Sequence, residues 1–461
     1  MTGIAVADRP TISQSGEPRL SLPRWDGATL LILLVAVNVL VPSAYAISVI
    51  GGMATPANLL GMLALVWWFN ARLLGGGDVA TGPQPVRVAI KVFGLAVLLS
   101  YVAAAARPLS ADEVTAADRG VLDLLTWAGI ALVAVDGIQN RRRLDTVLKA
   151  VVAAGAFAAA IGFLQFFGGF DPAKALKLPG LSLVRVITSV DIRSGYRRVA
   201  GTAVHPIEFG VVMAMTLPIA LHYAFYATTK WAKRWHWFCA ALIGVALPLS
   251  LSRTAILGVT VVGLMLFATW SWKRRGRAMV VLVVFVNGLQ FVVPGLFGTL
   301  RSLFLNLGND PSVSGRTSDY ALVGDLVANN PVVGRGFRTF IPEKFILHTG
   351  EGGGTLILDN QYLGTLIEMG AFGLFSLFFL FLVVLGCARS IRRRSADPST
   401  RDLAQSMAAA VMVAMLSFAT FDGFSFPMAT ILLFLLVGCA GALRRLVLEE
   451  KAAGGQVPEG T

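Results

Sequence analysis

Charged residues are scarce in this chain of 461 residues. Asp, Glu, Lys and Arg make up 14% of it, hydrophobic residues make up 56%, and the mean hydropathy is +0.71. About a quarter of the residues of an ordinary soluble protein are charged, so this composition excludes an ordinary soluble fold. No polar stretch is long enough to form a separate soluble domain.

Cysteines are also few. Cys239, Cys387 and Cys439 all lie within apolar runs, and no pair has the spacing of metal ligands or indicates a disulfide framework. We therefore expect no metal and no cofactor. The chain has 26 acidic residues against 39 Lys and Arg, which gives a formal net charge of +13. The basic cytoplasmic loops of a membrane protein explain this charge better than nucleic-acid binding does.

Apolar runs of membrane-spanning length recur along the whole chain. A bilayer core needs about 20 apolar residues per helix, and sliding-window hydropathy supports most of the runs. In the fifth run, Ala154, Ala158 and Gly162 recur every fourth residue, which favours close helix packing. The predicted fold class is all-α, a polytopic transmembrane helical bundle of about 12 spans. The predicted spans are 29–49, 57–74, 88–106, 120–138, 147–168, 207–226, 237–251, 254–271, 279–297, 362–388, 403–421 and 427–446.

Basic residues orient this bundle. With the N-terminus in the cytoplasm, every inner loop is basic, as the positive-inside rule requires. Two helices over 237–251 and 254–271, joined by a turn at "LSRT", keep the later basic loops on the cytoplasmic side. One continuous helix would move every later loop to the opposite side of the membrane. Arg253 therefore lies at the outer surface, between helices. The predicted domains are a cytoplasmic, disordered tail (1–27), a transmembrane domain (28–446) and a cytoplasmic tail (447–461).

Two outer loops break the positive-inside rule. Loop 169–206 contains Arg198, and loop 298–361 contains Arg316, Arg335 and Arg338. Guanidinium forks match phosphate geometry, and several forks around one site bind a diphosphate strongly. A polyprenyl pyrophosphate bearing a sugar chain is an abundant ligand of this type outside the bacterial cytoplasmic membrane. We expect Arg198, Arg253 and Arg316 to converge on it; solvated surface charge is the alternative for any one arginine.

The loop 298–361 contains its own predicted helix. Tyr320, Val323 and Val327 in "SGRTSDYALVGDLVANNPVVGRGF" have helical spacing, which predicts an amphipathic interfacial helix over about 315–329. Ser314 is a candidate N-cap, and Asn329 to Pro331 end the helix. The glycines on either side of Arg335 then allow a tight turn, and helix and turn together suggest a lid.

Four polar residues stand where outer loops become helices or just inside them. His205 precedes Pro206 and is either a base or a structural residue of the helix start. Asp359 is either an N-cap or a general base that positions an acceptor, and Asn360 follows it. Glu368 lies about two turns into its span, where a carboxylate is costly and usually has a purpose; pairing with an arginine is the simplest one.

Four segments together resemble the O-antigen ligase and O-antigen polymerase superfamily of membrane glycosyltransferases. They are "RVAGTAVHPIEFG", "LSLSRTAILG", "GRTSDYALVGDLVANNPVVGRGF" and "DNQYLGTLIEMGAFGL". The resemblance implies a GT-C-like helical bundle and metal-independent transfer on the outer face of the cytoplasmic (inner) membrane of a bacterium. The donor is an undecaprenyl-pyrophosphate-linked glycan, and the acceptor is a glycan or lipid hydroxyl.

The resemblance also implies roles for individual residues. Arginines matching Arg198, Arg253 and Arg316 hold the diphosphate and stabilise the charge that develops on it. The expected catalytic residues are Asp359, Arg316, Arg253 and Glu368. The expected diphosphate-binding residues are Arg198, Arg253, Arg316, Arg335, Arg338, His205 and Asn360.

One departure from the family pattern leaves the exact reaction open. Ligases of the family carry a histidine where this chain has Asp359, so ligase and polymerase both remain candidates, with other polysaccharide assembly proteins as further partners. A lipid-linked sugar flippase or other transporter is a second class of function. A non-catalytic scaffold of a polysaccharide assembly complex is a third.

Overall fold

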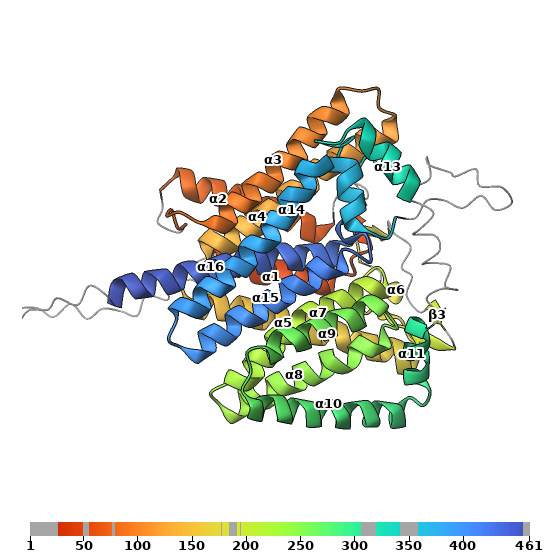
Figure 1. Cartoon of the computed structure of the whole chain (residues 1–461), viewed down its shortest axis with the longest axis vertical. Helices are drawn as coiled ribbons and strands as arrows, with labels where there is room; N and C mark the ends of the chain where they lie inside the picture. Colours follow the sequence, from red (N-terminus) through yellow and green to blue (C-terminus); the bar gives the residue numbers. More distant parts are fainter. Residues whose placement is uncertain are drawn as a thin grey trace, which may run out of the picture.

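The chain folds as a bundle of helices that run lengthwise beside one another (Figure 1). The computed structural model describes residues 26–48, 55–75, 79–176, 178–183, 191–193, 195–305, 320–341 and 358–454. Within these residues almost all of the regular structure is helical, which confirms the predicted all-α class.

Each of the twelve predicted spans overlaps a helix. These helices are α1 (Gly27–Leu40), α2 (Pro56–Leu73), α3 (Pro85–Ala105), α4 (Ala111–Gly137), α5 (Arg141–Gly168), α7 (Pro206–Tyr226), α8 (Lys230–Leu249), α9 (Arg253–Phe267), α10 (Trp272–Val292), α14 (Gln361–Arg394), α15 (Pro398–Ser417) and α16 (Pro427–Gly454). Among the described helices, seven are long and apolar enough to cross a membrane, namely α3, α4, α5, α7, α10, α14 and α16. The chain is therefore an integral membrane protein.

The remaining described elements are short. They are α6 (Pro172–Ala175), α11 (Leu296–Leu305), α13 (Tyr320–Asn329), the 3-10 turn η3 (Gly423–Ser425) and the strands β1 (Tyr45–Ile47), β2 (Leu181–Leu183), β3 (Asp191–Arg193) and β4 (Tyr196–Arg198). Strand β1 pairs antiparallel with β2, and β3 pairs antiparallel with β4. Hydropathy does not predict these strands, because each has three residues and is held by pairing with another segment of the chain.

Several predicted boundaries are wrong. Helix α1 ends at Leu40, well before the predicted 49, because the chain enters strand β1 at Tyr45. Helix α4 begins at Ala111 and not at 120, because Ser110 caps it. Helix α8 begins at Lys230, well before the predicted 237, because the side chain of Thr229 caps it. Helix α16 continues to Gly454, so the start of the predicted tail 447–461 is helical. The interfacial helix α13 ends at Asn329 as predicted, while Ser314 and the start predicted near 315 lie outside the described residues. The tail 1–25 also lies outside them.

The break between α8 and α9 has a local cause and confirms the predicted turn at "LSRT". Pro248 lies in the last turn of α8, and Leu251 takes a left-handed conformation with φ of 47°. The side chain of Ser252 then accepts a hydrogen bond from the backbone N–H of Ala255 at 3.4 Å and starts α9. Arg253 is consequently the first residue of a helix.

The connecting segments gather at two opposite ends of the bundle. We call one the site end; it comprises segments 41–48, 106–110, 195–205, 250–252, 331–341, 358–360 and 418–426. The other, the basic end, comprises segments 79–84, 138–140, 227–229, 268–271 and 395–397. At the basic end Arg143 pairs with Asp26, and Arg274 pairs with Asp402 at 2.8 Å. Hydrogen bonds between loops also tie the site end together, as described next.

Candidate functional site

Two of the three arginines expected to hold a diphosphate lie beside the same turn. Arg198 ends strand β4 and is buried; its Nε donates to the carbonyl oxygen of Ser250 at 3.4 Å. The N–H of Val199 donates to the carbonyl of Leu249 at 3.4 Å. Since Arg253 follows three residues after Ser250, the fold brings together arginines that are 55 positions apart in the chain. Arg316 lies outside the described residues.

A buried glutamine of α5, which the sequence analysis missed, holds the segment after Arg198. Oε1 of Gln165 accepts hydrogen bonds from the N–H groups of Ala200 at 3.1 Å and Gly201 at 2.7 Å. Its Nε2 donates to the carbonyl of Gly201 at 2.8 Å. Gly201 has φ of +58°, and a Cβ there would lie 2.8 Å from the carbonyl oxygen of Ala158. A lone amide in an apolar helix was the available signal, because burying one without partners is costly.

His205 is part of a helix start. It is the N-cap of α7, and its Nδ1 accepts a hydrogen bond from the N–H of Ile207 at 3.1 Å. When Nδ1 of a neutral imidazole accepts, Nε2 carries the proton, so this geometry does not favour His205 as a base. Fully buried Glu208 accepts from the N–H groups of Val204 at 2.9 Å and Met428 at 2.7 Å. It thereby ties the starts of α7 and α16 together.

The N-cap of α14 is Asn360, so the N-cap interpretation of Asp359 is wrong. Oδ1 of Asn360 accepts from the N–H groups of Tyr362 at 3.0 Å and Leu363 at 3.3 Å. Asp359 precedes this cap and is half-buried. Because the cap is made by the neighbouring residue, the carboxylate of Asp359 is not required to start the helix.

The segment 418–426 joins the start of α14 to the start of α9. The N–H of Gln361 donates to the carbonyl of Phe418 at 2.8 Å, and its Oε1 accepts from the N–H of Phe424 at 2.7 Å. On the other side, the hydroxyls of Thr254 and Thr420 are 2.9 Å apart. Asp359 and Arg253 therefore flank one connecting segment.

Helix α14 is broken near its start, which the sequence analysis did not foresee. Gly370 has φ of 64° and ψ of −165°, and the chain segment 331–336 fills the break. The N–H groups of Arg335 and Gly336 donate to the carbonyls of Ile367 and Glu368 at 3.0 and 2.9 Å. The N–H groups of Ala371 and Phe372 donate back to the carbonyls of Pro331 and Val332 at 2.8 and 3.0 Å. Irregular backbone inside a membrane bundle needs such partners.

This interlock requires glycine and corrects the expectation of a lid. A Cβ on Gly334 would lie 2.2 Å from the carbonyl carbon and oxygen of Glu368, and one on Gly370 would lie 2.4 Å from the carbonyl of Val332. The hydroxyl of Ser100 on α3 donates to the same Glu368 carbonyl at 2.6 Å. The turn is thus fastened between α3 and α14, and a freely opening lid does not fit this geometry.

Arg335, expected to bind diphosphate, forms an ion pair with an acidic residue of α4. Its Nη2 lies 3.1 Å from Oε1 of Glu113, and Nη2 of Arg107 lies 2.9 Å from the same oxygen. Burial, and then the neighbouring Arg107, lower the pKa of Arg335 below its ordinary value, although Glu113 opposes them. Two guanidinium groups therefore share one carboxylate here.

Arg338 is bound still more closely. Its Nη2 lies 2.7 Å from Oδ2 of Asp123 and donates to the carbonyl of Phe424 at 2.6 Å. Burial alone would lower the pKa of Arg338, but Asp123, Asp422 and Glu368 outweigh it and raise the pKa. Glu368 is 9% exposed, and its Oε1 accepts from the N–H of Phe340 at 3.4 Å. Glu368 therefore belongs to the anchoring of the 331–341 turn.

The acidic partners of these arginines were not among the predicted site residues. Glu113 and Asp123 lie on α4, and Asp422 lies in the 418–426 segment. A carboxylate next to or inside an apolar run was the available signal, because a buried charge is usually paired. Among the described residues, no group of three or more His, Cys, Asp and Glu has an arrangement able to hold a metal ion.

A comparison with known families finds a match to the central part of the chain. Residues 238–378 match the model of a family described as O-antigen ligase. This match confirms the family resemblance over the α8–α9 turn, the 331–341 turn and the broken start of α14. A comparison with curated proteins finds no match.

Proposed function

We propose that this O-antigen ligase-like integral membrane protein is a glycosyltransferase of surface polysaccharide biosynthesis. It transfers a glycan from an undecaprenyl-pyrophosphate-linked donor to an acceptor hydroxyl. The observation that carries the proposal is the position of Arg198 and Arg253 beside one turn at the site end. Arg253 and this turn lie within the family match. Asp359 stands across the 418–426 segment from them.

The arginines stabilise the leaving group. The donor diphosphate is held by Arg198, Arg253 and Arg316. Because Arg253 is the first residue of α9, the positive end of that helix dipole also lies close to the diphosphate. Negative charge grows on the diphosphate as the bond to the anomeric carbon breaks. Cations placed there in advance lower the barrier, and removing one such group typically costs about 10²–10³ in rate.

Asp359 receives the proton of the acceptor. The acceptor oxygen forms its bond to the anomeric carbon, the anomeric carbon–diphosphate bond breaks, and the hydroxyl proton passes to the carboxylate of Asp359. The half-buried position of Asp359 ahead of the Asn360 cap supports this role. Glu368, Arg335 and Arg338 position the site by fastening the 331–341 turn, and His205 and Asn360 position helix starts.

The transfer assay compares the loss of an arginine at the proposed site with the loss of an exposed arginine elsewhere. We expect Arg253→Ala to lower the transfer rate from a purified lipid-linked donor about 10²–10³-fold, whereas Arg301→Ala, an exposed arginine of α11, leaves the rate unchanged. Normal transfer by a folded Arg253→Ala protein would exclude the proposal. In cells lacking the gene, long undecaprenyl-linked chains indicate a ligase, and single repeat units left in place indicate a polymerase.

The site end faces the outside of the bacterial inner membrane, and both termini face the cytoplasm. Arginines and lysines crowd the basic end, which supports this orientation. Cysteines at exposed Asp112 and Leu183 should react with an impermeant thiol reagent in cells with a permeabilised outer envelope, whereas those at Arg142 and Lys273 should not. The three native cysteines are buried and add little background. The opposite labelling pattern would reject the outer site.

One observation favours the transporter as a second candidate, because transporters bind substrates at broken helices. In transporters such breaks come in pairs from two related halves, whereas among the described helices only α14 contains non-helical residues within a span. Movement of the donor lipid across proteoliposomes without glycan transfer would support the transporter.

A further inference from the structure

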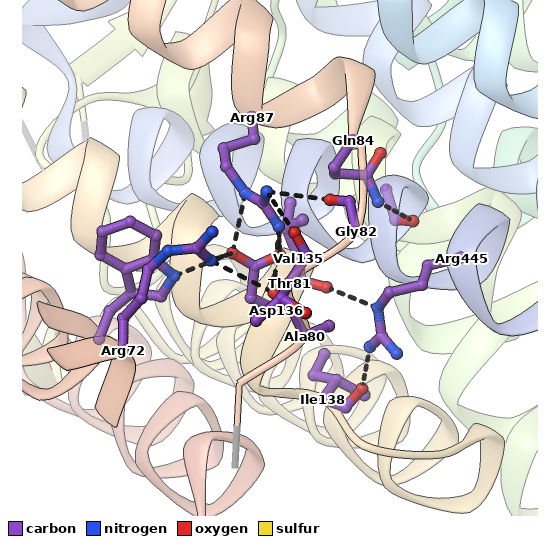
Figure 2. A network of polar contacts seen from close by, with 12 residues as sticks. Arg72, Ala80, Thr81, Gly82, Gln84, Arg87, Val135, Asp136, Ile138 and Arg445 are labelled. Atoms are coloured by element: carbon purple, nitrogen blue, oxygen red, sulfur yellow. Dashed lines mark hydrogen bonds and ion pairs between the residues drawn. The ribbon is translucent and has the colours of Figure 1, made fainter. Parts of the chain in front are cut away.

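A large pocket among the described residues lies at the basic end, away from the proposed active site. Its volume is about 620 Å³, within the range of small-ligand sites. It is enclosed by the end of α2, the segment 79–84 and the last turns of α16. Figure 2 shows the polar network behind it.

A buried carboxylate builds the wall of this pocket. Asp136 of α4 accepts hydrogen bonds from the indole of Trp68 at 3.0 Å and from Arg87 at 3.0 and 2.6 Å. Arg87 also donates to the carbonyls of Ala80 and Gly82 at 3.1 Å each (Figure 2). The charge of Asp136 is thus neutralised by Arg87 inside the protein. Arg87 also holds the 79–84 segment in place around the pocket.

The lining itself carries excess positive charge. Arg72, Arg444 and Arg445 line the pocket, and Glu449 is the one carboxylate among its described lining residues, which leaves a net charge of +2. Arg445 pairs with Glu449 at 3.0 Å and donates to the carbonyls of Val135 and Ile138. Arg444 makes no hydrogen bond or ion pair with any residue in the described ranges. The pocket is therefore suited to an anion.

Exposed apolar side chains lie beside the pocket in the chain. Leu73 and Leu74, at the end of α2, are 80% and 83% exposed, and Leu448 of α16 lines the pocket. Arg72 lies over the ring of Trp68, its guanidinium carbon 5.3 Å from the ring centre. Arginine side chains near the ends of membrane helices typically reach the headgroup level of a bilayer. The hydrocarbon chains of an anionic lipid could lie beside these leucines while its headgroup enters the pocket.

We propose that this pocket binds the phosphate-bearing headgroup of an anionic phospholipid from the leaflet at the basic end. The phosphate lies among Arg72, Arg444 and Arg445, and the acyl chains run along Leu73 and Leu74. Basic pockets between transmembrane helices bind such headgroups by charge and guanidinium fit. The inference is independent of the proposed glycosyl transfer, because the pocket lies at the opposite end of the helices.

The test measures lipid binding to the full-length protein in detergent by native mass spectrometry, with phosphatidylglycerol titrated in. Replacing Arg444 by Gln should weaken the tightest binding step about fivefold, the typical effect of one surface arginine on an anionic lipid, and Arg444→Lys should restore most of it. Arg444 has no partner to lose, so the variant should fold. The matched control is Arg393→Gln, which removes the same charge from an exposed position at the same end.

Three outcomes would overturn the proposal. One is unchanged lipid binding by Arg444→Gln, and another is an equal loss in Arg393→Gln, which would indicate general surface charge. The third is displacement of the bound lipid by millimolar inorganic phosphate or glycerol 3-phosphate, which would assign the pocket to a soluble phosphate. Neutral phosphatidylcholine should bind at least fivefold more weakly than phosphatidylglycerol to the unmodified protein, and this preference should be smaller in Arg444→Gln.

Discussion

The interlock between the 331–336 segment and the broken helix α14 predicts a large effect from one methyl group. In Gly334→Ala, the new Cβ would lie 2.2 Å from backbone atoms of Glu368, and the residue would keep φ of +71°. Two backbones cannot both remain in place at this distance. The segment must therefore withdraw from the break.

The magnitude follows from the bonds that are lost. Withdrawal breaks four backbone hydrogen bonds, those of Arg335 and Gly336 to α14 and those of Ala371 and Phe372 to the segment. At about 1 kcal/mol each, the loss is about 4 kcal/mol. If the segment stays partly docked, an alanine at position 334 with a left-handed backbone adds roughly 1–2 kcal/mol to the destabilisation. We expect Gly334→Ala to lose about 4 kcal/mol of unfolding free energy.

A glycine of the same helix supplies the control. Gly386 has helical backbone, and no atom lies within 4 Å of a Cβ placed on it. Gly386→Ala should be neutral or stabilising by up to about 1 kcal/mol, because alanine favours a helix. Both variants are unfolded by titration with a denaturing detergent. Trp127 reports the change, since its ring lies 6.2 Å from Phe337 of the interlocking turn. Equal stability of the two variants would refute the interlock.

Three further predictions test other parts of the fold. Burial alone would raise the pKa of Asp26, but hydrogen bonds from Arg143 and Thr29 outweigh it and lower the pKa. A carboxylate with a lowered folded-state pKa stabilises the protein above its unfolded-state pKa, so the thermal stability advantage over Asp26→Asn should be full above about pH 5 and should be lost as the pH falls through the folded-state pKa. A gap independent of pH would contradict this. Gln165→Leu should cost at least about 2 kcal/mol, because the N–H groups of Ala200 and Gly201 lose their acceptor. Gln165→Glu should also lose stability, because an oxygen would replace the amide nitrogen that donates to the carbonyl of Gly201; unchanged stability of Gln165→Leu would exclude the acceptor role. Glu208→Gln should lose roughly 1–2 kcal/mol, because one of two accepting oxygens becomes a donor facing an N–H group; denaturation matching the unmodified protein would contradict it.

Local chemistry was sufficient to predict most of the architecture. The lengths of the apolar runs predict the twelve long helices, because a helix satisfies its backbone hydrogen bonds within one segment. Pro206 at the start of α7, Asn329 at the end of α13 and Ser252 at the start of α9 act on their own neighbours in sequence. The proximity of Arg198 to Arg253 was expected from topology alone, since both flank spans at the same end.

Long-range contacts decided what local chemistry left open. Gly370 is one glycine among several in its span, and the helix breaks there because the 331–336 segment meets its backbone. The residues next to Arg335 and Arg338 in the sequence do not distinguish them from arginines exposed at a surface. The packing of α4 against the turn pairs them with Glu113 and Asp123.

The sequence by itself determined which residues form helices and which ends of those helices are basic, because hydrogen bonds within a helix and the hydropathy of a run involve near neighbours. Only the tertiary structure decided which helix is broken and which arginines have carboxylate partners. Those outcomes depend on backbone and charged groups that are far apart in the chain and meet when the helices pack.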